Sequence, residues 1–287
     1  MQVSPAAAGA LVRVAPTAAF VLLWSSGALF ARWGLAHASP FAFLVLRFVV
    51  ALAFLGLLAL AGHRLRPQPG SAGRVACSGL LLAGAYPACY FLALDRGLTP
   101  GVLATVLGVQ PLLTLALTER PLAGRRIAGL LVALTGLALV VFDSLVQSRF
   151  HPLGLGFALA ALGAMTWGTL QQKRLDQPPL AVMPLQLAMG LVVCLCLLPF
   201  EAVRVDWNWQ LAVTVAWLGI PISVAGTLLL YQLLARGNVV DVTSLFYLVP
   251  AGTALLDALV FGHVLAPLAL AGMAAIVGGL VMVFRRV

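Results

Sequence analysis

The sequence has very little charge for its length. Only 9% of its 287 residues are charged, 62% are hydrophobic, and the mean hydropathy is +1.08. A typical soluble domain carries about 25% charged residues, which cover its surface. This composition excludes a water-soluble protein and predicts one that lies in a membrane.

The chain also lacks the residue patterns of common enzyme and metal sites. It contains no H-E-x-x-H motif, no G-x-S-x-G motif and no close pair of carboxylates within an apolar run. Its 4 cysteines have no metal-ligand spacing with its 4 histidines. The only lysine, Lys173, lies at the end of an apolar run. We therefore expect no catalytic residue, no metal and no cofactor.

Long apolar runs recur along the whole chain. A helix of about 20 residues crosses the ~30 Å hydrocarbon core of a bilayer. Continuous runs favour helices, because the strands of a membrane barrel alternate apolar and polar residues. The sequence predicts an all-α membrane protein with ten transmembrane helices, over about 15–33, 40–62, 75–94, 99–118, 124–142, 153–172, 181–200, 211–234, 239–262 and 266–284.

The basic residues lie mainly in alternate loops. With ten crossings, twelve of the 17 lysine and arginine residues fall on the side of the two termini and four on the other, with Arg47 inside a run. Cytoplasmic loops of membrane proteins carry the excess of lysine and arginine. We therefore expect both termini in the cytoplasm, and we assign the net charge of +9 to topology and contact with lipid rather than to nucleic-acid binding.

Landmarks in the first half of the chain recur in the second half at offsets of 139 to 143 residues. Such self-similarity indicates an internal repeat. We predict one repeat over 15–142, a linker over 143–152 and a second repeat over 153–284. The matching pairs are Trp24 and Trp167, Tyr90 and Tyr231, Gly97 and Gly237, Pro111 and Pro250, Gly129 and Gly272, and Gly136 and Gly279.

Each predicted repeat holds five helices. Because five is odd, the second repeat must enter the membrane in the opposite orientation to the first. Inverted repeats occur in secondary transporters, with the substrate site near the midplane between the halves. The paired glycines Gly129 and Gly136, and Gly272 and Gly279, are seven residues apart, so each pair shares one helix face and is expected to allow close helix packing.

At these landmarks the sequence resembles the drug/metabolite transporter superfamily, EamA type. The resemblance rests on LLWSSGALFARWGL and SPFAFLVLRF early in the chain, GVLATVLGVQPLL before the first glycine pair, and VTSLFYLVPAGTALL before the second. The Trp-Ser-Ser-Gly opening resembles the bacterial amino-acid exporters of this family. The resemblance implies a multi-pass protein of the bacterial inner membrane that exports small metabolites such as amino acids.

Polar and aromatic residues within the predicted spans are the candidates for a substrate site, because each is costly where it faces lipid. Several recur at helical spacing or in both halves, which favours an aromatic-lined central cavity over isolated packing residues. The predicted substrate-binding residues are Trp24, Tyr86, Tyr90, Gln110, Trp167, Tyr231, Ser244 and Tyr247. Aromatic faces and hydroxyls would suit aromatic or hydrophobic amino acids.

Two charged residues lie inside the predicted spans. Arg47 either extends outward to the interface or supplies a positive charge for a substrate carboxylate. Its counterpart at an offset of 139 is Gln186, which is uncharged. Asp257 either lies solvated near the outer end of its helix or couples transport to protons.

We therefore predict a transporter that moves amino acids by alternating access, with membrane lipid and a small-molecule substrate as its partners. Pro111 and Pro250 occupy matching places and are expected to let their helices bend. Export of drugs or other metabolites stays open within the family, and a membrane enzyme acting on lipid-linked substrate is the alternative of another class. A single chain carries both repeats, which is compatible with a monomer.

Overall fold

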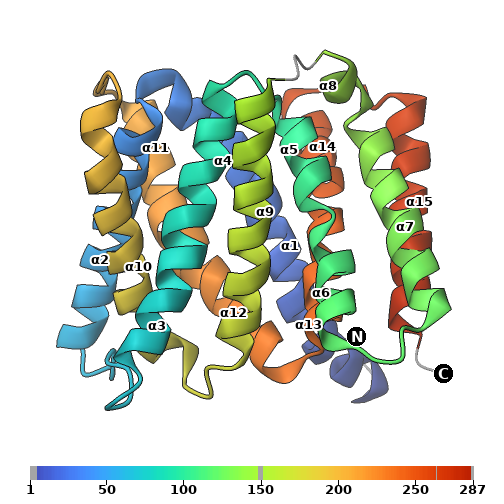
Figure 1. The fold of residues 1–287 in the computed structure, drawn as a ribbon, viewed down its shortest axis with the longest axis horizontal. Helices are drawn as coiled ribbons and strands as arrows, with labels where there is room; N and C mark the ends of the chain where they lie inside the picture. Colours follow the sequence, from blue (N-terminus) through green and yellow to red (C-terminus); the bar gives the residue numbers. More distant parts are fainter. Residues whose placement is uncertain (1–4, 148–150, 263, 286–287) are drawn as a thin grey trace.

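The described residues form a bundle of helices that run between two opposite faces (Figure 1). The computed structural model describes residues 5–147, 151–262 and 264–285. In these ranges, nine helical segments are long and apolar enough to cross a membrane. A tenth helix, α7 (Gly124–Val140), has 17 residues and packs along α15 (Pro267–Phe284), one of the nine. Since about 17 residues are enough for a membrane span, the prediction of ten crossings is confirmed.

The first five crossings contain seven helical elements and one π-helical segment. Three crossings are single helices and two are composite. They are α1 (Pro5–His37); α2 (Pro40–Leu60); α3 (Ala72–Gly79) with η1 (Leu80–Ala85) and α4 (Tyr86–Asp95); α5 (Pro100–Leu107) with α6 (Gln110–Thr118); and α7. The predicted linker, residues 143–152, contains most of a short helix, α8 (Phe142–Val146), and the first residue of the sixth crossing, Pro152.

The second five crossings repeat this pattern of single and composite helices. The third of them again contains a π-helical segment, and the fourth is again interrupted. They are α9 (Pro152–Lys173); α10 (Pro179–Leu197) with η2 (Leu198–Phe200); α11 (Trp209–Trp217) with η3 (Leu218–Gly226) and α12 (Thr227–Arg236); α13 (Val239–Ser244) with η4 (Leu245–Tyr247) and α14 (Leu248–Phe261); and α15.

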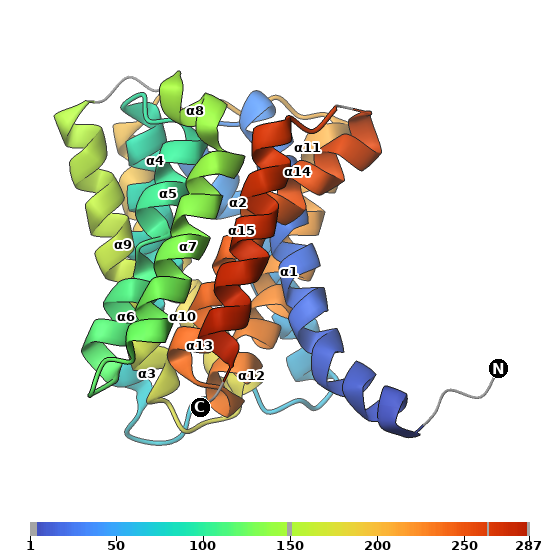
Figure 2. The ribbon, with the colours of Figure 1, turned by 90° about the vertical axis from the view of Figure 1, so that its right-hand side faces the viewer.

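The two halves run in opposite directions through the bundle. In Figure 2, α1 rises from the face that carries both termini, whereas Figure 1 shows α9 descending from the opposite face. We call these the terminus-side face and the far face. The chain therefore has the inverted-repeat arrangement that an odd number of helices in each half requires.

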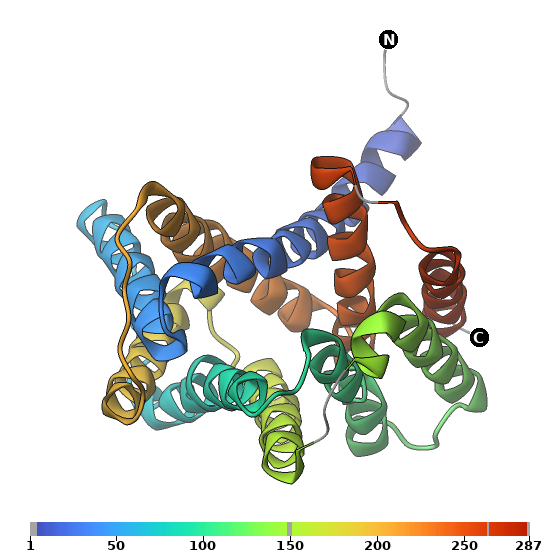
Figure 3. The same ribbon diagram turned by 90° about the horizontal axis from the view of Figure 1, so that it is seen from above.

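The halves interleave rather than standing side by side as separate units. Helix α1 of the first half packs on α14 and η3 of the second, and α9 of the second half packs on α4 and α6 of the first. Figure 3 shows α2 and α10 together at one end of the elongated bundle, with α7 and α15 at the other. Any space at the centre is therefore walled by both halves.

Two reciprocal glycine contacts hold α7 against α15. A Cβ atom added to Gly136 would lie 2.6 Å from the carbonyl oxygen of Gly272, and one added to Gly272 would lie 2.6 Å from the carbonyl oxygen of Gly136. Gly129 faces Gly279 in the same way. The absence of side chains lets the two backbones touch, so the prediction that these glycines serve helix packing is confirmed.

The third and eighth crossings both contain π-helical turns near their centres. In η1 and η3 the backbone widens before α4 and α12 continue. Pro87 follows η1 and Pro221 lies within η3, so each turn lies beside a residue that lacks a backbone donor. Such π turns are rare in proteins, and those that occur frequently lie at functional sites.

The fourth and ninth crossings are interrupted at matching places. The fourth is broken at Gly108 and Val109, between α5 and α6, and the ninth narrows to a 3₁₀ turn over η4. Pro111 and Pro250 each follow the interruption by a few residues. Pro111 and Pro250 therefore lie next to matching interruptions in their helices, as their matching places in the two halves predict.

Candidate functional site

A cavity with two connected lobes lies between the halves. The far-side lobe has a volume of about 270 Å³ and includes Ala31, Tyr90 and Leu107 in its wall. The terminus-side lobe has a volume of about 120 Å³ and includes Leu82, Thr169 and Leu230. Both lobes share six wall residues, which join them into one site: Trp24, Arg47, Tyr86, Pro87, Met165 and Phe246.

The residues Trp24-Ser25-Ser26-Gly27 divide their roles between wall and helix contact. Trp24 and Gly27 line the cavity. Ser25 is fully buried and donates a hydrogen bond to the carbonyl oxygen of Val249, 3.1 Å away on α14. Ser26 accepts a hydrogen bond from the indole nitrogen of Trp217 at 3.1 Å. The two serines thus fix α1 to the second half and hold Trp24 at the cavity.

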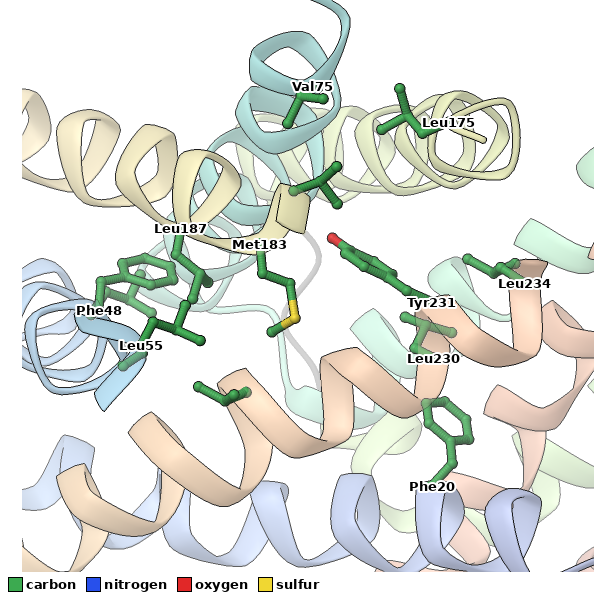
Figure 4. Close-up of a cluster of buried hydrophobic side chains, with 14 of the residues drawn as sticks. Phe20, Phe48, Leu55, Val75, Leu175, Met183, Leu187, Leu230, Tyr231 and Leu234 are labelled. Carbon is green, nitrogen blue, oxygen red and sulfur yellow. The ribbon is translucent and has the colours of Figure 1, made fainter. Parts of the chain in front are cut away.

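Aromatic rings of both halves meet at the junction of the lobes. The Trp24 ring lies 4.9 Å from Phe20 and 5.9 Å, edge to face, from Phe246 of the other half. Tyr86 and Tyr90 lie one turn apart on α4, with ring centroids 6.2 Å apart. In Figure 4, Tyr231 extends from α12 toward Met183 of α10. Rings that contact one another in this way form a rigid apolar wall for a flat or aliphatic ligand.

Arg47 supplies the charge in this wall. It is half-buried and points into the bundle rather than outward, because its Nε atom donates a 2.7 Å hydrogen bond to Ser223 in η3. The Ser223 hydroxyl donates to the carbonyl oxygen of Leu218, so its oxygen is free to accept from Arg47. Among the described residues that line the two lobes, none is Asp or Glu. The described wall therefore combines aromatic and apolar side chains with a few uncharged polar ones and a single fixed cation, Arg47.

Comparison with known proteins identifies the family to which this architecture belongs. The family model described as the EamA-like transporter family matches residues 15–142 and 154–285, one match in each half. The chain belongs to the EamA-like transporter family. The family consists of transporters and not of enzymes, so this chain is a multi-pass membrane transporter.

The fold of this EamA-like transporter has been seen before. A solved structure superposes with a TM-score of 0.77 at 26% sequence identity, over 94% of this chain and 96% of that one. It is described only as a crystal structure of a protein, so it assigns no substrate. No curated protein sequence matches the chain.

The transporter brings six of the eight predicted substrate-binding residues to the cavity. Trp24 and Tyr86 line both lobes, Tyr231 lines the terminus-side lobe, and Tyr90, Gln110 and Tyr247 line the far-side lobe. Gln110 is fixed by a 3.2 Å hydrogen bond to Thr169, and Tyr247 by a 2.6 Å hydrogen bond to the carbonyl oxygen of Gly108. The Tyr247 hydroxyl is thus occupied, and its ring is what it offers to the cavity.

Trp167 does not line the cavity, contrary to the prediction. It lies on the outer face of α9, where 52% of its surface is exposed. The offset of 143 aligned it with Trp24, but Met165, at an offset of 141, occupies the matching wall position. Two residues along a helix turn a side chain by about 200°, onto the opposite face. Trp167 therefore faces lipid.

Ser244 and Asp257 also lie outside both lobes. Ser244 is fully buried, but its hydroxyl donates to the carbonyl oxygen of Asp241 within its own helix, 2.8 Å away. Its polarity is satisfied locally, as is common for serine in helices. Asp257 lies on α14, beyond the part of that helix that reaches the cavity. Asp257 is therefore not among the described residues that line the two lobes.

The structure adds wall residues that sequence reasoning missed. Met165 and Thr169 share one face of α9, and Phe246 lies next to Tyr247 in η4. The offset of 141 that pairs Tyr90 with Tyr231 also pairs Trp24 with Met165, so the repeat held the signal for Met165. Ser223 carried no such signal, because its role depends on the contact with Arg47 across two helices.

A charged cluster joins the two halves at the terminus-side face. Arg126, at the start of α7, contacts Glu119 at 2.5 Å and also forms an ion pair with Asp241 at the start of α13. Asn238 donates a 3.0 Å hydrogen bond to Glu119 and caps α13 through its side-chain oxygen. The cluster ties loops of opposite halves together at the ends of the two broken crossings.

Proposed function

We propose that this transporter exports amino acids, chiefly aromatic or other hydrophobic ones, by alternating access. The observation that carries the proposal is the central cavity, whose wall combines aromatic rings from both halves with one inward-pointing guanidinium. The rings of Trp24, Tyr86 and Phe246 suit an apolar side chain, and Arg47 suits a carboxylate. An amphipathic monocarboxylate is the ligand class that satisfies both.

Transport by purified protein tests this proposal. The protein is reconstituted into proteoliposomes, and uptake of radiolabelled phenylalanine, tryptophan, leucine, glycine and glutamate is measured with and without a pH gradient. We expect saturable uptake of the aromatic and hydrophobic amino acids, and weaker uptake of glycine and glutamate. If the folded protein gives no saturable flux of any amino acid, the proposal is wrong. The gradient separates proton-linked from uncoupled transport.

Export of drugs or other metabolites is the alternative within the family. Nucleotide-linked cargo is disfavoured, because phosphates require several cations and Arg47 is the only cationic residue among the described residues of the cavity wall. An uncharged aromatic drug would use the rings and not Arg47. Competition of such a compound with phenylalanine uptake distinguishes the two, since only a carboxylate substrate should depend on Arg47.

We further propose that the terminus-side face is cytoplasmic in the bacterial inner membrane. Arg64 and Arg174 lie in loops at that face, and Arg74 and Arg125 lie in the first turns of α3 and α7, which begin there. Lysine and arginine are enriched on the cytoplasmic side of membrane proteins. Single cysteines placed in these loops should resist a membrane-impermeant thiol reagent in intact cells. Labelling from outside would reverse the assignment.

Because one chain supplies both walls of the cavity, we propose that a monomer is the transport unit. Light scattering of the detergent-solubilised protein measures its mass directly. Full activity at one protein per liposome is the expected result, whereas activity that requires several copies per liposome would contradict it.

A further inference from the structure

We propose that the terminus-side lobe binds the head group of an α-amino acid in one orientation, with the carboxylate at Arg47 and the ammonium at Gln186. The side chain then lies in the larger far-side lobe. This inference rests on the proposed function and assigns the two ends of the substrate to two residues. Gln186 lines the terminus-side lobe with Arg47, at the matching position of the other half, an offset of 139 residues.

Arg47 is positioned to receive a carboxylate. Its Nε atom donates a 2.7 Å hydrogen bond to Ser223. This bond fixes the plane of the guanidinium and leaves its two terminal amino groups to bind a ligand. Two parallel N–H groups match the two oxygens of a carboxylate. No acidic side chain among the described residues pairs with Arg47, so its positive charge is available to a ligand.

Gln186 is positioned to receive a hydrogen-bond donor. Its Nε2 atom donates to Gln172 at 2.7 Å and to Ser78 at 3.2 Å, which fixes the side chain. Its Oε1 atom is buried and accepts no hydrogen bond from the described residues. Buried polar atoms in proteins are rarely left without a partner. An ammonium, with three N–H donors, would supply that partner after a small adjustment of the amide.

A glycine of the facing crossing brings each of these residues close to the neighbouring helix. A Cβ atom on Gly79 would lie 3.0 Å from Cγ of Gln186, and one on Gly219 would lie 3.2 Å from the carbonyl oxygen of Arg47. Ser78 then reaches Gln186, and Ser223 reaches Arg47. Each half thus has a polar residue held by a glycine and a serine of the facing crossing, a cation at Arg47 and an acceptor at Gln186. Because one is a cation and the other an acceptor, a zwitterion has a preferred orientation between them.

The sizes of the lobes agree with this orientation. The terminus-side lobe, about 120 Å³, is the smaller space; its wall contains Gln186, which the far-side lobe lacks, together with Arg47, which lines both lobes. The far-side lobe, about 270 Å³, adds Tyr90, Tyr247 and Phe91 to the shared ring of Trp24. A compact polar head group fits the first, and a bulky apolar side chain fits the second.

Competition with two half-substrates tests the assignment. Uptake of radiolabelled phenylalanine into proteoliposomes is measured against 3-phenylpropanoate, which lacks the ammonium, and phenethylamine, which lacks the carboxylate. For the wild-type protein, each analogue should compete at least about tenfold more weakly than unlabelled phenylalanine, the loss expected for one charged hydrogen bond.

Two variants separate the ends of the substrate. Arg47→Gln should weaken phenylalanine and 3-phenylpropanoate by about tenfold and leave phenethylamine unchanged. Gln186→Met, which keeps the size but removes the acceptor, should weaken phenylalanine and phenethylamine and leave 3-phenylpropanoate unchanged. If Gln186→Met does not fold, Gln186→Glu serves instead, and it should strengthen competition by phenethylamine.

Gln171→Met is the matched control, because Gln171 lies on α9 outside both lobes, and it should change none of the three ligands. If Gln186→Met weakens both analogues alike, or neither, the orientation is wrong. If the wild-type protein takes up phenylalanine but both analogues compete as well as phenylalanine, the orientation is also wrong while the proposed function stands. If the wild-type protein takes up no amino acid, the proposed function itself fails.

Discussion

The hydroxyl of Tyr247 donates a 2.6 Å hydrogen bond to the carbonyl oxygen of Gly108, and the two residues occupy matching places in the two halves. Their offset of 139 is the offset of Pro111 and Pro250. Carbonyls at a helix end lack the donors that a continuous helix provides. Tyr247, at the interruption of the ninth crossing, thus supplies a hydrogen-bond donor to the free carbonyl at the interruption of the fourth. This bond ties the two broken crossings together at the cavity.

Tyr247→Phe should destabilise the protein by about 1–3 kcal/mol, because it leaves the buried Gly108 carbonyl without a donor while keeping the ring. Thermal unfolding of the detergent-solubilised protein measures the loss. Substitution of another tyrosine, Tyr90→Phe, is a suitable comparison, since no hydrogen bond links the Tyr90 hydroxyl to another described residue. Equal stability of the Tyr247 variant and the wild-type protein would contradict the structural role of the bond.

Adjacent glycines of α15 should respond in opposite ways to alanine. Gly279→Ala places a methyl group 2.7 Å from the backbone nitrogen of Ala133 and should force α15 away from α7, with a loss of at least about 1–3 kcal/mol. Gly278→Ala meets nothing within 4 Å and should be neutral or slightly stabilising, because alanine favours helices over glycine by about 1 kcal/mol. Unfolding temperatures of the two variants provide the measurement. Similar values for both would show that close packing at Gly279 is unimportant.

Trp24 and Trp167 should differ in their effect on transport, although both are tryptophans of an opening helix of their half. Trp24→Leu removes a ring from the junction of the lobes and should raise the half-saturation concentration for phenylalanine by about two- to tenfold, since a buried aromatic contact contributes about 0.5–1.5 kcal/mol beyond its burial. Trp167→Leu changes a lipid-facing side chain and should leave transport unchanged. Uptake kinetics of both variants decide this, and an equal loss in both would place Trp167 back at the site.

The ion pair between Arg126 and Asp241 is expected to hold the terminus-side face closed. Its two side chains are only 17% and 30% exposed and belong to opposite halves, so the pair is less screened than a surface ion pair. Arg126→Gln should therefore increase thiol labelling of a cysteine introduced at Leu230, in a protein whose native cysteines are replaced. The rate of labelling from the terminus side measures the opening.

Arg96→Gln is the control for this experiment, because the Arg96–Asp95 pair is 47% and 65% exposed and lies within one half. It should leave the labelling rate unchanged. If Arg126→Gln labels no faster than Arg96→Gln, the cluster serves stability alone and another contact closes this face.

Much of the architecture could be predicted from the sequence because it depends on runs and spacing. Apolar runs long enough to cross a bilayer predict helices, since no other open structure satisfies its backbone hydrogen bonds in lipid. The offsets that pair Pro111 with Pro250 and Gly136 with Gly272 predict two copies, and five helices per copy make them inverted. The breaks near both prolines and the glycine contacts followed from the same spacings.

The order of residues is enough to predict which segments cross the membrane and which residues correspond in the two halves. The face of each helix that meets the cavity depends on how the helices pack. In a soluble protein, polar residues mark the outer face of a helix, but in a bilayer both the lipid face and the packed face are apolar. An offset that was wrong by two residues therefore predicted Trp167 at the cavity, although it faces lipid, and nothing in the apolar pattern marked the difference. The contacts of Arg47 with Ser223 and of Gln186 with Ser78 likewise depend on how separate helices are placed together.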